Sequence, residues 1–285
     1  MKRSNVLLSL LGLIALAKAS AAPSQTMEPG ERHQVLLEYH NEFSNSDGSE
    51  GSSQGRQAIT VRLIAKRDGG QELEFALPDS ATEQDRLREW QLPARIFVAA
   101  DGRGTLLNTS ELEVRRNRFL AAAKLTQAAC GKWVFTWNAF KIECDPQSAL
   151  EIAETYRLQP QGPLTDGAPF TQRDAVGSAV LACSPVDGGG QVCSVTLPVD
   201  AAKLRREKAE ADVVVGEING HPVTLVDALK AYERVEVEGT IETVLAVDAD
   251  GSVTKRTTIV RVKLREPDGK TETSTSTSVL TRTRL

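Results

Sequence analysis

Two Asp-Gly pairs divide the last fifty residues into three segments that alternate polar and apolar side chains. Asp250-Gly251 and Asp268-Gly269 are each typical of the two-residue turn of a β-hairpin. Because side chains alternate between the two faces of a strand, the turns fix which residues lie opposite one another. We therefore predict that this region forms a three-stranded antiparallel meander.

Counting back from the first turn gives a register in which opposite charges meet. It places Glu236 opposite Arg265, and Glu238 opposite Lys263. The second turn, taken the same way, places Arg265 opposite Glu272. The third segment, 271–283, consists almost wholly of Thr, Ser and Arg, which is typical of an exposed edge strand.

The apolar face of the first two strands is a candidate ligand surface. Gly239 leaves a gap among larger apolar side chains, and long strands with a gap can curve around a helix or around a ligand. A helix from 224–231 or 201–211 that covers this face is the alternative. The residues expected to face an acyl chain are Val237, Gly239, Ile241, Val260, Val262 and Leu264.

The rest of the chain mixes short strand signals with helix signals. Further strands are expected at 33–43, 58–65 and 72–77, and a mobile loop at 44–55. Capping residues begin helices that are expected at 80–90, 108–128 and 200–211. Since no strand–helix–strand rhythm appears, we predict an α+β fold, in which antiparallel sheets carry helices packed on one face.

The chain is expected to divide into two halves. A signal peptide at 1–21 precedes an N-terminal α+β half, 22–158, and a C-terminal α+β half, 175–285. Residues 159–174 hold three prolines and two glycines, which favours a linker or a long loop between the halves. One continuous domain is the alternative.

The first residues have the order of a secretory signal. Lys2 and Arg3 precede an apolar run at 6–17, and the small residues Ala19-Ser-Ala21 follow. The run is too short to span a bilayer, which takes about 20 residues. We therefore predict cleavage near Ala21 and a periplasmic or secreted mature chain without a transmembrane segment.

Four cysteines follow, and an even number in an exported chain favours disulfides. We predict the pairs Cys130–Cys144 and Cys183–Cys193, because each brackets a stretch with the signals of a hairpin. Zinc binding is the alternative. It is disfavoured because the spacings contain no C-x-x-C and no histidine is near, so no metal site is expected.

The net charge and the short motifs of the chain argue against nucleic-acid binding and give little support to a hydrolase site. The formal net charge is −4, and the signal segment is basic, so the remainder is more acidic still, which argues against nucleic-acid binding. The segment 51–55 matches the G-x-S-x-G pattern of serine hydrolases, but it falls in the expected loop. His33 and His40 should point to opposite faces of one strand, and they and His221 are expected to be ordinary surface or edge histidines.

No catalytic or cofactor-binding residue is assigned on this basis. Long strands with helices on one side would resemble the incomplete barrels of periplasmic lipoprotein and lipid carriers. That resemblance concerns the fold alone, with no matching motif, and fold does not fix function. For function, we expect a non-enzymatic binding or carrier module for a small or lipid-like ligand. The alternatives are an envelope scaffold that binds another envelope protein, and a hydrolase with an unrecognised site.

Overall fold

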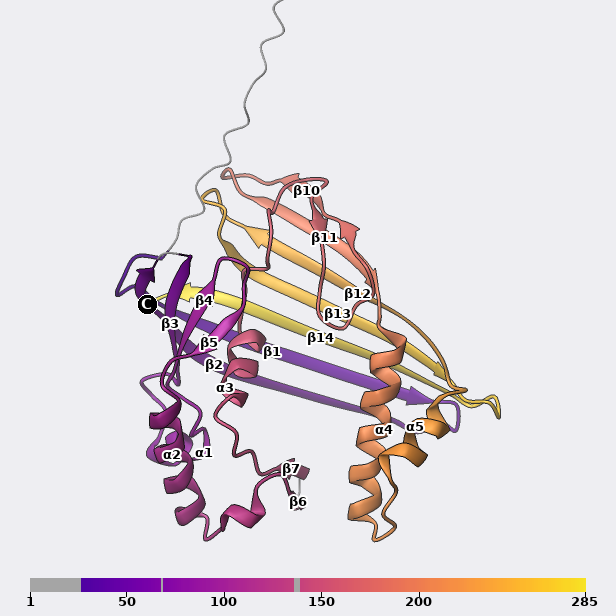
Figure 1. Ribbon diagram of the computed structural model, residues 1–285. Coiled ribbons are helices and arrows are strands. Elements are labelled where there is room, and N and C mark those ends of the chain that lie inside the picture. Colours follow the sequence, from indigo (N-terminus) through magenta and orange to yellow (C-terminus); the bar gives the residue numbers. More distant parts are fainter. Residues whose placement is uncertain (1–26, 68, 136–138) are drawn as a thin grey trace, which may run out of the picture.

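One antiparallel sheet of ten strands dominates the computed structural model, which describes residues 27–67, 69–135 and 139–285 (Figure 1). The predicted signal peptide lies outside these residues. The sheet is open, with β10 at one edge and β5 at the other. In spatial order its strands are β10 (Ala182–Pro185), β11 (Gln191–Pro198), β12 (Glu236–Val247), β13 (Val253–Arg265), β14 (Thr271–Arg284), β1 (Arg32–Asn45), β2 (Glu50–Arg67), β3 (Gly70–Ala76), β4 (Ala94–Ala99) and β5 (Gly104–Leu106).

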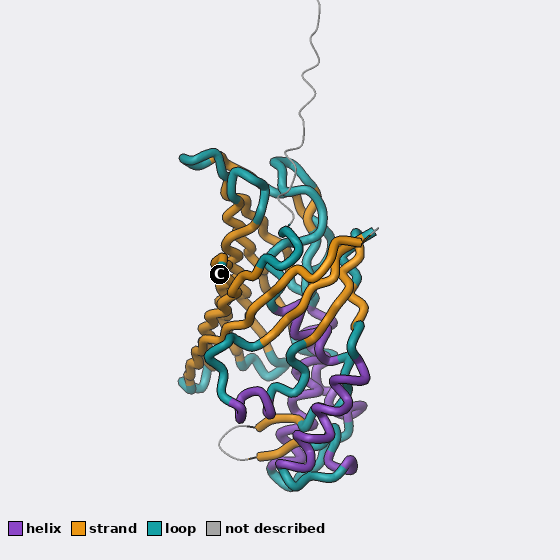
Figure 2. Tube along the Cα trace, turned by 90° about the vertical axis from the view of Figure 1, so that its left-hand side faces the viewer, coloured by secondary structure: helices purple, strands orange, loops and turns teal. Residues whose placement is uncertain are grey.

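Helices and two small strand pairs complete the α+β fold that the sequence predicts. The helices are α1 (Glu83–Arg88), α2 (Thr109–Ala122), α3 (Ser148–Thr155), α4 (Ala201–Ile218) and α5 (Leu225–Tyr232), with a 3-10 turn at Gln127–Ala129. The small pairs are β6 (Trp133–Phe135) with β7 (Ala139–Lys141), and β8 (Pro169–Phe170) with β9 (Ala179–Val180). Figure 2 shows that the sheet is strongly twisted, so its strands do not share one plane.

Strands from both predicted halves belong to this one sheet. β1 pairs along its length with β14, so that Leu37 lies opposite Leu280. The main hydrophobic core also draws on both halves, from Leu63 and Ile96 to Leu197. The division into two halves stays a prediction, and the unfolding experiment described below tests it.

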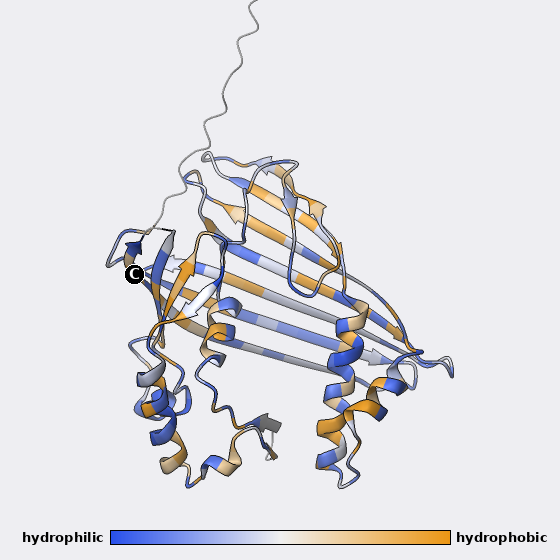
Figure 3. Ribbon diagram, in the orientation of Figure 1, coloured by the Kyte–Doolittle hydropathy of each residue, from blue (hydrophilic) through white to orange (hydrophobic). Residues whose placement is uncertain are grey.

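The position of β14 corrects one expectation. Its Ser- and Thr-rich sequence was expected at an edge, but β13 and β1 pair with it on its two sides. Figure 3 shows that the middle of the sheet is largely hydrophilic there. The edge prediction was wrong because polar residues on both faces of a strand indicate only that both faces are solvent-exposed. They do not indicate whether other strands pair with it on its two sides.

The register of β12 and β13 is the predicted one. Val237 lies opposite Leu264, and Ile241 lies opposite Val260. The turn itself differs, because only Gly251 has a positive φ and Asp248 N donates to Ser252 O across 2.9 Å. Thr254 is an extra residue in a bulge beside the turn, and it restores the expected pairing.

The register of β13 and β14 differs from the prediction by one residue. Arg265 lies opposite Thr271, and Glu272 lies opposite Leu264. Pro267 has a fixed negative φ and only Gly269 adopts a positive one, so the chain makes a longer turn that ends in a left-handed glycine. No bulge compensates here, and Glu272 therefore points to the other face, where its Oε1 lies 2.5 Å from Nζ of Lys208 on α4.

The predicted loop at 44–55 is mostly strand. β1 continues to Asn45, and β2 begins at Glu50. The ring of Tyr39 lies over Gly55, and that of Phe43 lies over Gly51, where a Cβ would overlap each ring. The loop prediction was wrong because these glycines make room for cross-strand aromatic rings rather than for a flexible turn.

Helix boundaries differ in detail from the expected ones. Thr82 and Asp85, rather than Ser80 and Glu83, form the capping box of α1. The side chain of Asn108 makes no cap; its Oδ1 accepts from Arg95 N at 2.9 Å. α2 ends at Ala122, whereas α4, which Asp200 caps as predicted, continues to Ile218.

Both predicted disulfides are present. Cys130 joins Cys144, and Cys183 joins Cys193 directly across the β10–β11 pair. Across the described ranges, no helix is long and apolar enough to cross a membrane.

Candidate functional site

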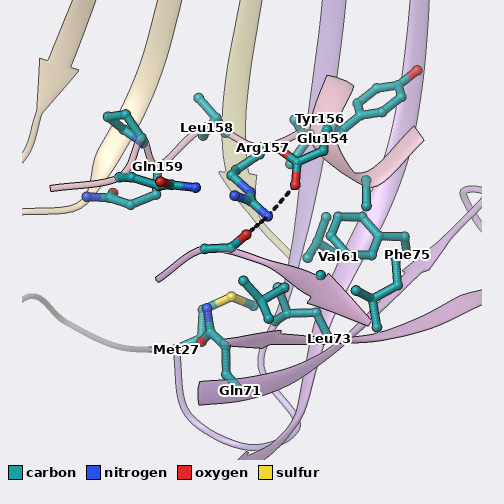
Figure 4. A pocket seen from close by; sticks show the side chains of 18 of the residues that line it. Met27, Val61, Gln71, Leu73, Phe75, Glu154, Tyr156, Arg157, Leu158 and Gln159 are labelled. Carbon is teal, nitrogen blue, oxygen red and sulfur yellow. Dashed lines mark hydrogen bonds and ion pairs between the residues drawn. The ribbon is translucent and has the colours of Figure 1, made fainter. Parts of the chain in front are cut away.

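An apolar cavity of about 300 Å³ lies between the sheet and α3 (Figure 4). Alternating positions on neighbouring strands place apolar side chains on one face of the sheet, which we call the inner face. The side chains that form the floor of the apolar cavity are Val35, Val61, Leu73, Phe75, Ile96 and Val98. Most of them are buried, so the floor is an extension of the hydrophobic core.

The opposite wall comes from α3 and the residues that follow it. Leu150 and Ala153 face the apolar cavity from α3, whose alanines allow a close approach to the sheet. Residues 156–162 continue the wall, so the first part of the predicted linker is a lining segment of the cavity. Gln161 packs against Gly102 in the β4–β5 turn, where a Cβ would lie 2.6 Å from its Cδ.

Arg157 ties this wall to the sheet. Its Nη2 donates to the Gly102 carbonyl oxygen at 2.8 Å, and its guanidinium forms an ion pair with Glu154 (Figure 4). Arg256 on β13 donates in turn to the Arg157 carbonyl oxygen at 3.0 Å. The charge of Arg157 is therefore already matched by the protein, and its role is to hold the wall in place.

Tyr156 is a second polar side chain in this wall. It is buried, and its hydroxyl donates to Gln57 Oε1 at 3.1 Å. Burial raises the pKa of Tyr156 to about 12, so the phenol is neutral at physiological pH. It acts as a structural hydrogen-bond donor rather than as a base.

A second space of about 250 Å³ adjoins the apolar cavity, and we call it the polar vestibule. Met27, His33, Ser252 and Arg282 line both spaces. The polar vestibule is further lined by Glu31, Asp248, Asp250, Thr254 and Arg284. The site is thus apolar at one end and charged at the other.

His33 is the most buried titratable group at this boundary. It is 7% exposed, its Nε2 lies 3.3 Å from Glu31 Oε1, and its buried Nδ1 has no hydrogen-bond partner. Burial, followed by the positive charge of Arg282, lowers the pKa of His33. The prediction of a surface or edge histidine was wrong for His33, because β1 is an interior strand and the side chain lies on its inner face, between the apolar cavity and the polar vestibule.

Arg282 differs from the other charged groups of the polar vestibule. Its side chain is partly exposed, and it makes no ion pair with any residue that the structure describes. Glu31 accepts from Glu28 N at 2.8 Å and pairs with Arg284 at 3.3 Å. Hydrogen bonds from Ser252, and more weakly Arg282, lower the pKa of Asp250.

The six residues predicted to face an acyl chain lie elsewhere on the inner face. Ile241 is 2% exposed and Leu264 is 6% exposed, and Val237, Val260 and Val262 are partly buried. The side chain of Val199 fills the space beside Gly239, 3.1 Å from where a Cβ would lie. Within the described part of the chain none of the six lines the apolar cavity. Their role as a ligand surface stays a prediction.

The hydrolase motif is built into a strand. Ser53 lies in β2, and its Oγ accepts from Asn41 Nδ2 at 3.2 Å. His40 points to the other face from Asn41 and lies 3.0 Å from Glu42 Oε1. Between residues 27 and 285, apart from the undescribed positions, no group of three or more metal-binding side chains comes together.

Sequence reasoning missed His33, Arg157 and Arg282. The alternation of His33 with Val35 and Leu37 was a usable signal, because it places the histidine on the apolar face of its strand. Arg282 had no local signal, since its place depends on the pairing of β1 with β14 across more than two hundred residues.

No protein-family model matches the chain, and no curated protein sequence matches it. Among solved structures, one of lipovitellin, titled for its lipid–protein interactions, is 8% identical, covers 90% of this chain and 25% of its own, and gives a TM-score of 0.38. A thioesterase II described as putative, from Thermobifida fusca, is 13% identical, covers 88% and 79%, and gives a TM-score of 0.11. The chain thus spans a quarter of the lipovitellin chain, and likenesses this weak carry no argument.

Proposed function

We propose that the protein is a non-enzymatic binding or carrier module that holds the alkyl chain of a small lipid-like molecule in the apolar cavity. The observation that carries the proposal is the cavity of about 300 Å³, which has an apolar floor and polar groups at one end. Binding sites for small molecules are mostly apolar, with a few placed polar groups, and begin at about this size.

The proposal includes the location and the arrangement of the helices. The two disulfides are consistent with an oxidising compartment, so the protein would act in the periplasm or outside the cell. The helices would lie on the inner face of the sheet and enclose the ligand. Two contacts support this: α3 lines the apolar cavity, and Lys208 of α4 meets Glu272 on the inner face of β14.

The volume of the apolar cavity sets the length of the alkyl tail that it can hold. The apolar cavity holds the equivalent of about ten water molecules at about 30 Å³ each, which is space for roughly eight to ten carbons. Each buried methylene contributes about 0.8 kcal/mol, or about fourfold in Kd. A chain of nine methylenes gains about 7 kcal/mol, against an association cost of about 4–15 kcal/mol. The tail therefore binds weakly alone, and head-group contacts decide the affinity.

A series of straight-chain alkyl carboxylates tests the proposal. Isothermal titration with chains of about six to fourteen carbons should show Kd falling about fourfold per methylene and then levelling near ten carbons. Levelling marks a filled cavity of fixed length. Absence of saturable binding, or an affinity that keeps rising with length, contradicts the proposal.

Three variants locate the binding. Val98→Trp fills the apolar cavity from β4 and should weaken binding at least tenfold. Leu150→Ala lengthens the cavity and should move the levelling point to longer chains, which keeps the test decisive if the tryptophan variant does not fold. Thr105→Trp adds the same ring on the exposed face of β5 and should leave binding unchanged.

A second function, partner binding in the cell envelope, is favoured by an exposed apolar patch. The patch lies where α4 meets α5 and consists of Val215, Ile218, Val223 and Val226. Val226 is 74% exposed, and clustered apolar side chains of this kind are typical of protein contacts. If this function holds, Val226→Glu should release a protein that copurifies with the wild type, while alkyl-chain binding is unchanged. A partner that stays bound to this variant speaks against the patch.

A further inference from the structure

We infer that Arg282 and His33 bind an anionic head group, so that the site takes single-chain carboxylates or phosphate monoesters in preference to neutral or cationic amphiphiles. The inference rests on the proposed function, because it assigns the polar end of the same site. The two head groups share the chemistry that matters here, which is a negatively charged group of oxygens.

The strand pairing brings the two side chains together. Arg282 lies opposite Val35, and His33 lies opposite Arg284, so Arg282 and His33 are diagonal neighbours on the inner face. Such neighbours are about 7–8 Å apart, a distance that one carboxylate or phosphate can bridge. Both side chains line the apolar cavity and the polar vestibule, so a head group between them stays continuous with a tail in the apolar cavity.

The arginines at this end of the site differ in how closely an acid pairs with them, and the carboxylates of Asp250 and Glu31 act on Arg282 only at longer range. Arg157 is paired with Glu154, and Arg284 is paired with Glu31. Arg282 forms no ion pair with the residues the structure describes, although it lies between an apolar cavity and solvent. A guanidinium presents a planar fork of donors that fits two oxygens of a carboxylate or phosphate.

His33 adds an unsatisfied atom that points to a ligand. Its side chain is 9% exposed and faces Glu31 through Nε2, which leaves the buried Nδ1 without a partner. Buried polar atoms in folded proteins nearly always have one. A bound anion favours the protonated imidazole, which then donates from Nδ1 to the head group.

Binding is therefore coupled to proton uptake at His33. The charged groups that face the polar vestibule with it are Glu31, Asp248, Asp250, Arg282 and Arg284. Burial and the positive charge of Arg282 lower the pKa of His33 and so disfavour the protonated imidazole in the free protein, and a bound anion opposes both effects. The affinity for anions should rise as the pH falls from about 7 to about 5.5, whereas that for a neutral alcohol should stay constant.

Four probes with the same ten-carbon tail test the inference: decanoate, decyl phosphate, decan-1-ol and decyltrimethylammonium. Titrated into the full mature chain, both anions should bind at least tenfold more tightly than decan-1-ol, and the cation more weakly than the alcohol. The tighter of the two anions identifies the head group. Binding of decan-1-ol within twofold of both anions overturns the inference but leaves the proposed function standing, whereas absence of binding by all four overturns the proposed function.

Substitutions distinguish the loss of a head-group contact from a general loss of structure. Arg282→Gln should weaken decanoate binding about tenfold and leave decan-1-ol unchanged. Arg261→Gln removes the same charge from the exposed outer face of β13 and should change neither. Asp250→Asn removes the acid that competes for Arg282 and should strengthen decanoate binding two- to threefold. Equal losses for decanoate and decan-1-ol in Arg282→Gln, or no gain in Asp250→Asn, contradict the inference.

Discussion

Glu72 is a fully buried carboxylate whose charge two arginines stabilise. Arg95 Nη2 donates to its Oε1 at 2.7 Å, and Arg67 pairs with its other oxygen. Hydrogen bonds from Arg95, and then from Arg67, outweigh burial and lower the pKa of Glu72. The carboxylate therefore joins β2, β3 and β4 at the end of the sheet that forms the floor of the apolar cavity.

Glu72→Gln should lower the free energy of unfolding by about 1–3 kcal/mol at pH 7, because the amide loses the charged acceptor and opposes the arginines with donors. Since the pKa is lowered on folding, the stabilisation is present above the ordinary value of 4.5 and is lost as the pH falls through the folded pKa. Urea unfolding of both proteins checks this. A difference between them that is the same at pH 7 and pH 3 contradicts it.

His33 should also make the free energy of unfolding depend on pH, but for a different reason: folding disfavours the charged form of His33, whereas it favours the charged form of Glu72. Its pKa is lowered on folding from the ordinary 6.5, so the unfolded chain binds more protons between the folded pKa and 6.5. The stability from this group is present above about pH 6.5 and falls as the pH drops through that window. Urea unfolding at pH 7.5 and 5.5 should show a smaller loss in His33→Gln than in the wild type. Equal losses would exclude this role.

Among the strands, Gly239 shows how tightly β12 is packed against its neighbours. A Cβ there would lie 2.5 Å from the Arg261 carbonyl oxygen of the neighbouring strand, and 3.1 Å from Val199. Gly239→Val should therefore destabilise the protein by about 1–3 kcal/mol. Thr240→Val, the next residue on the exposed face of the same strand, should stay within about 0.5 kcal/mol. Chemical unfolding of the two variants checks both values, and equal effects would contradict the enclosure.

Elements are predictable from the sequence where their signals are local. Alternation and turn residues predict β12, β13 and β14, and the spacing of the cysteines predicts both disulfides. The failures arise where a local signal has two structural meanings. Asp268-Gly269 suits a two-residue turn, but the preceding Pro267 selects another. The glycines of 51–55 suggest a loop, but they serve the rings of Tyr39 and Phe43.

Local sequence signals could not predict most of the candidate site, because the site is assembled from segments that are far apart in the chain. Its floor comes from four strands, its wall comes from α3, and its polar end comes from the β1–β14 pair. Alternation shows that Val35 and Leu73 face a core, but it does not show which helix covers them. The polar end exists only once the first and last strands of the chain meet.

The central position of β1 in the ten-stranded sheet determines how the fold unfolds. Because β1 pairs with β14 on one side and β2 on the other, neither half of the chain keeps a complete sheet without the other. We expect one cooperative unfolding transition, with coincident curves from circular dichroism and tryptophan fluorescence. Two separated transitions, with early proteolysis within 159–174, would support the division into two halves.

In the proposed function, the apolar cavity beneath α3 holds an alkyl tail. A crystal structure of the protein with 10-bromodecanoate tests this, because the anomalous signal of bromine marks the end of the tail. We predict one bromine peak between Leu73, Phe75 and Leu150, with the carboxylate at Arg282 and His33. A peak on the face formed by Val237 and Leu264, or no peak in crystals soaked at saturating concentration, would contradict this assignment.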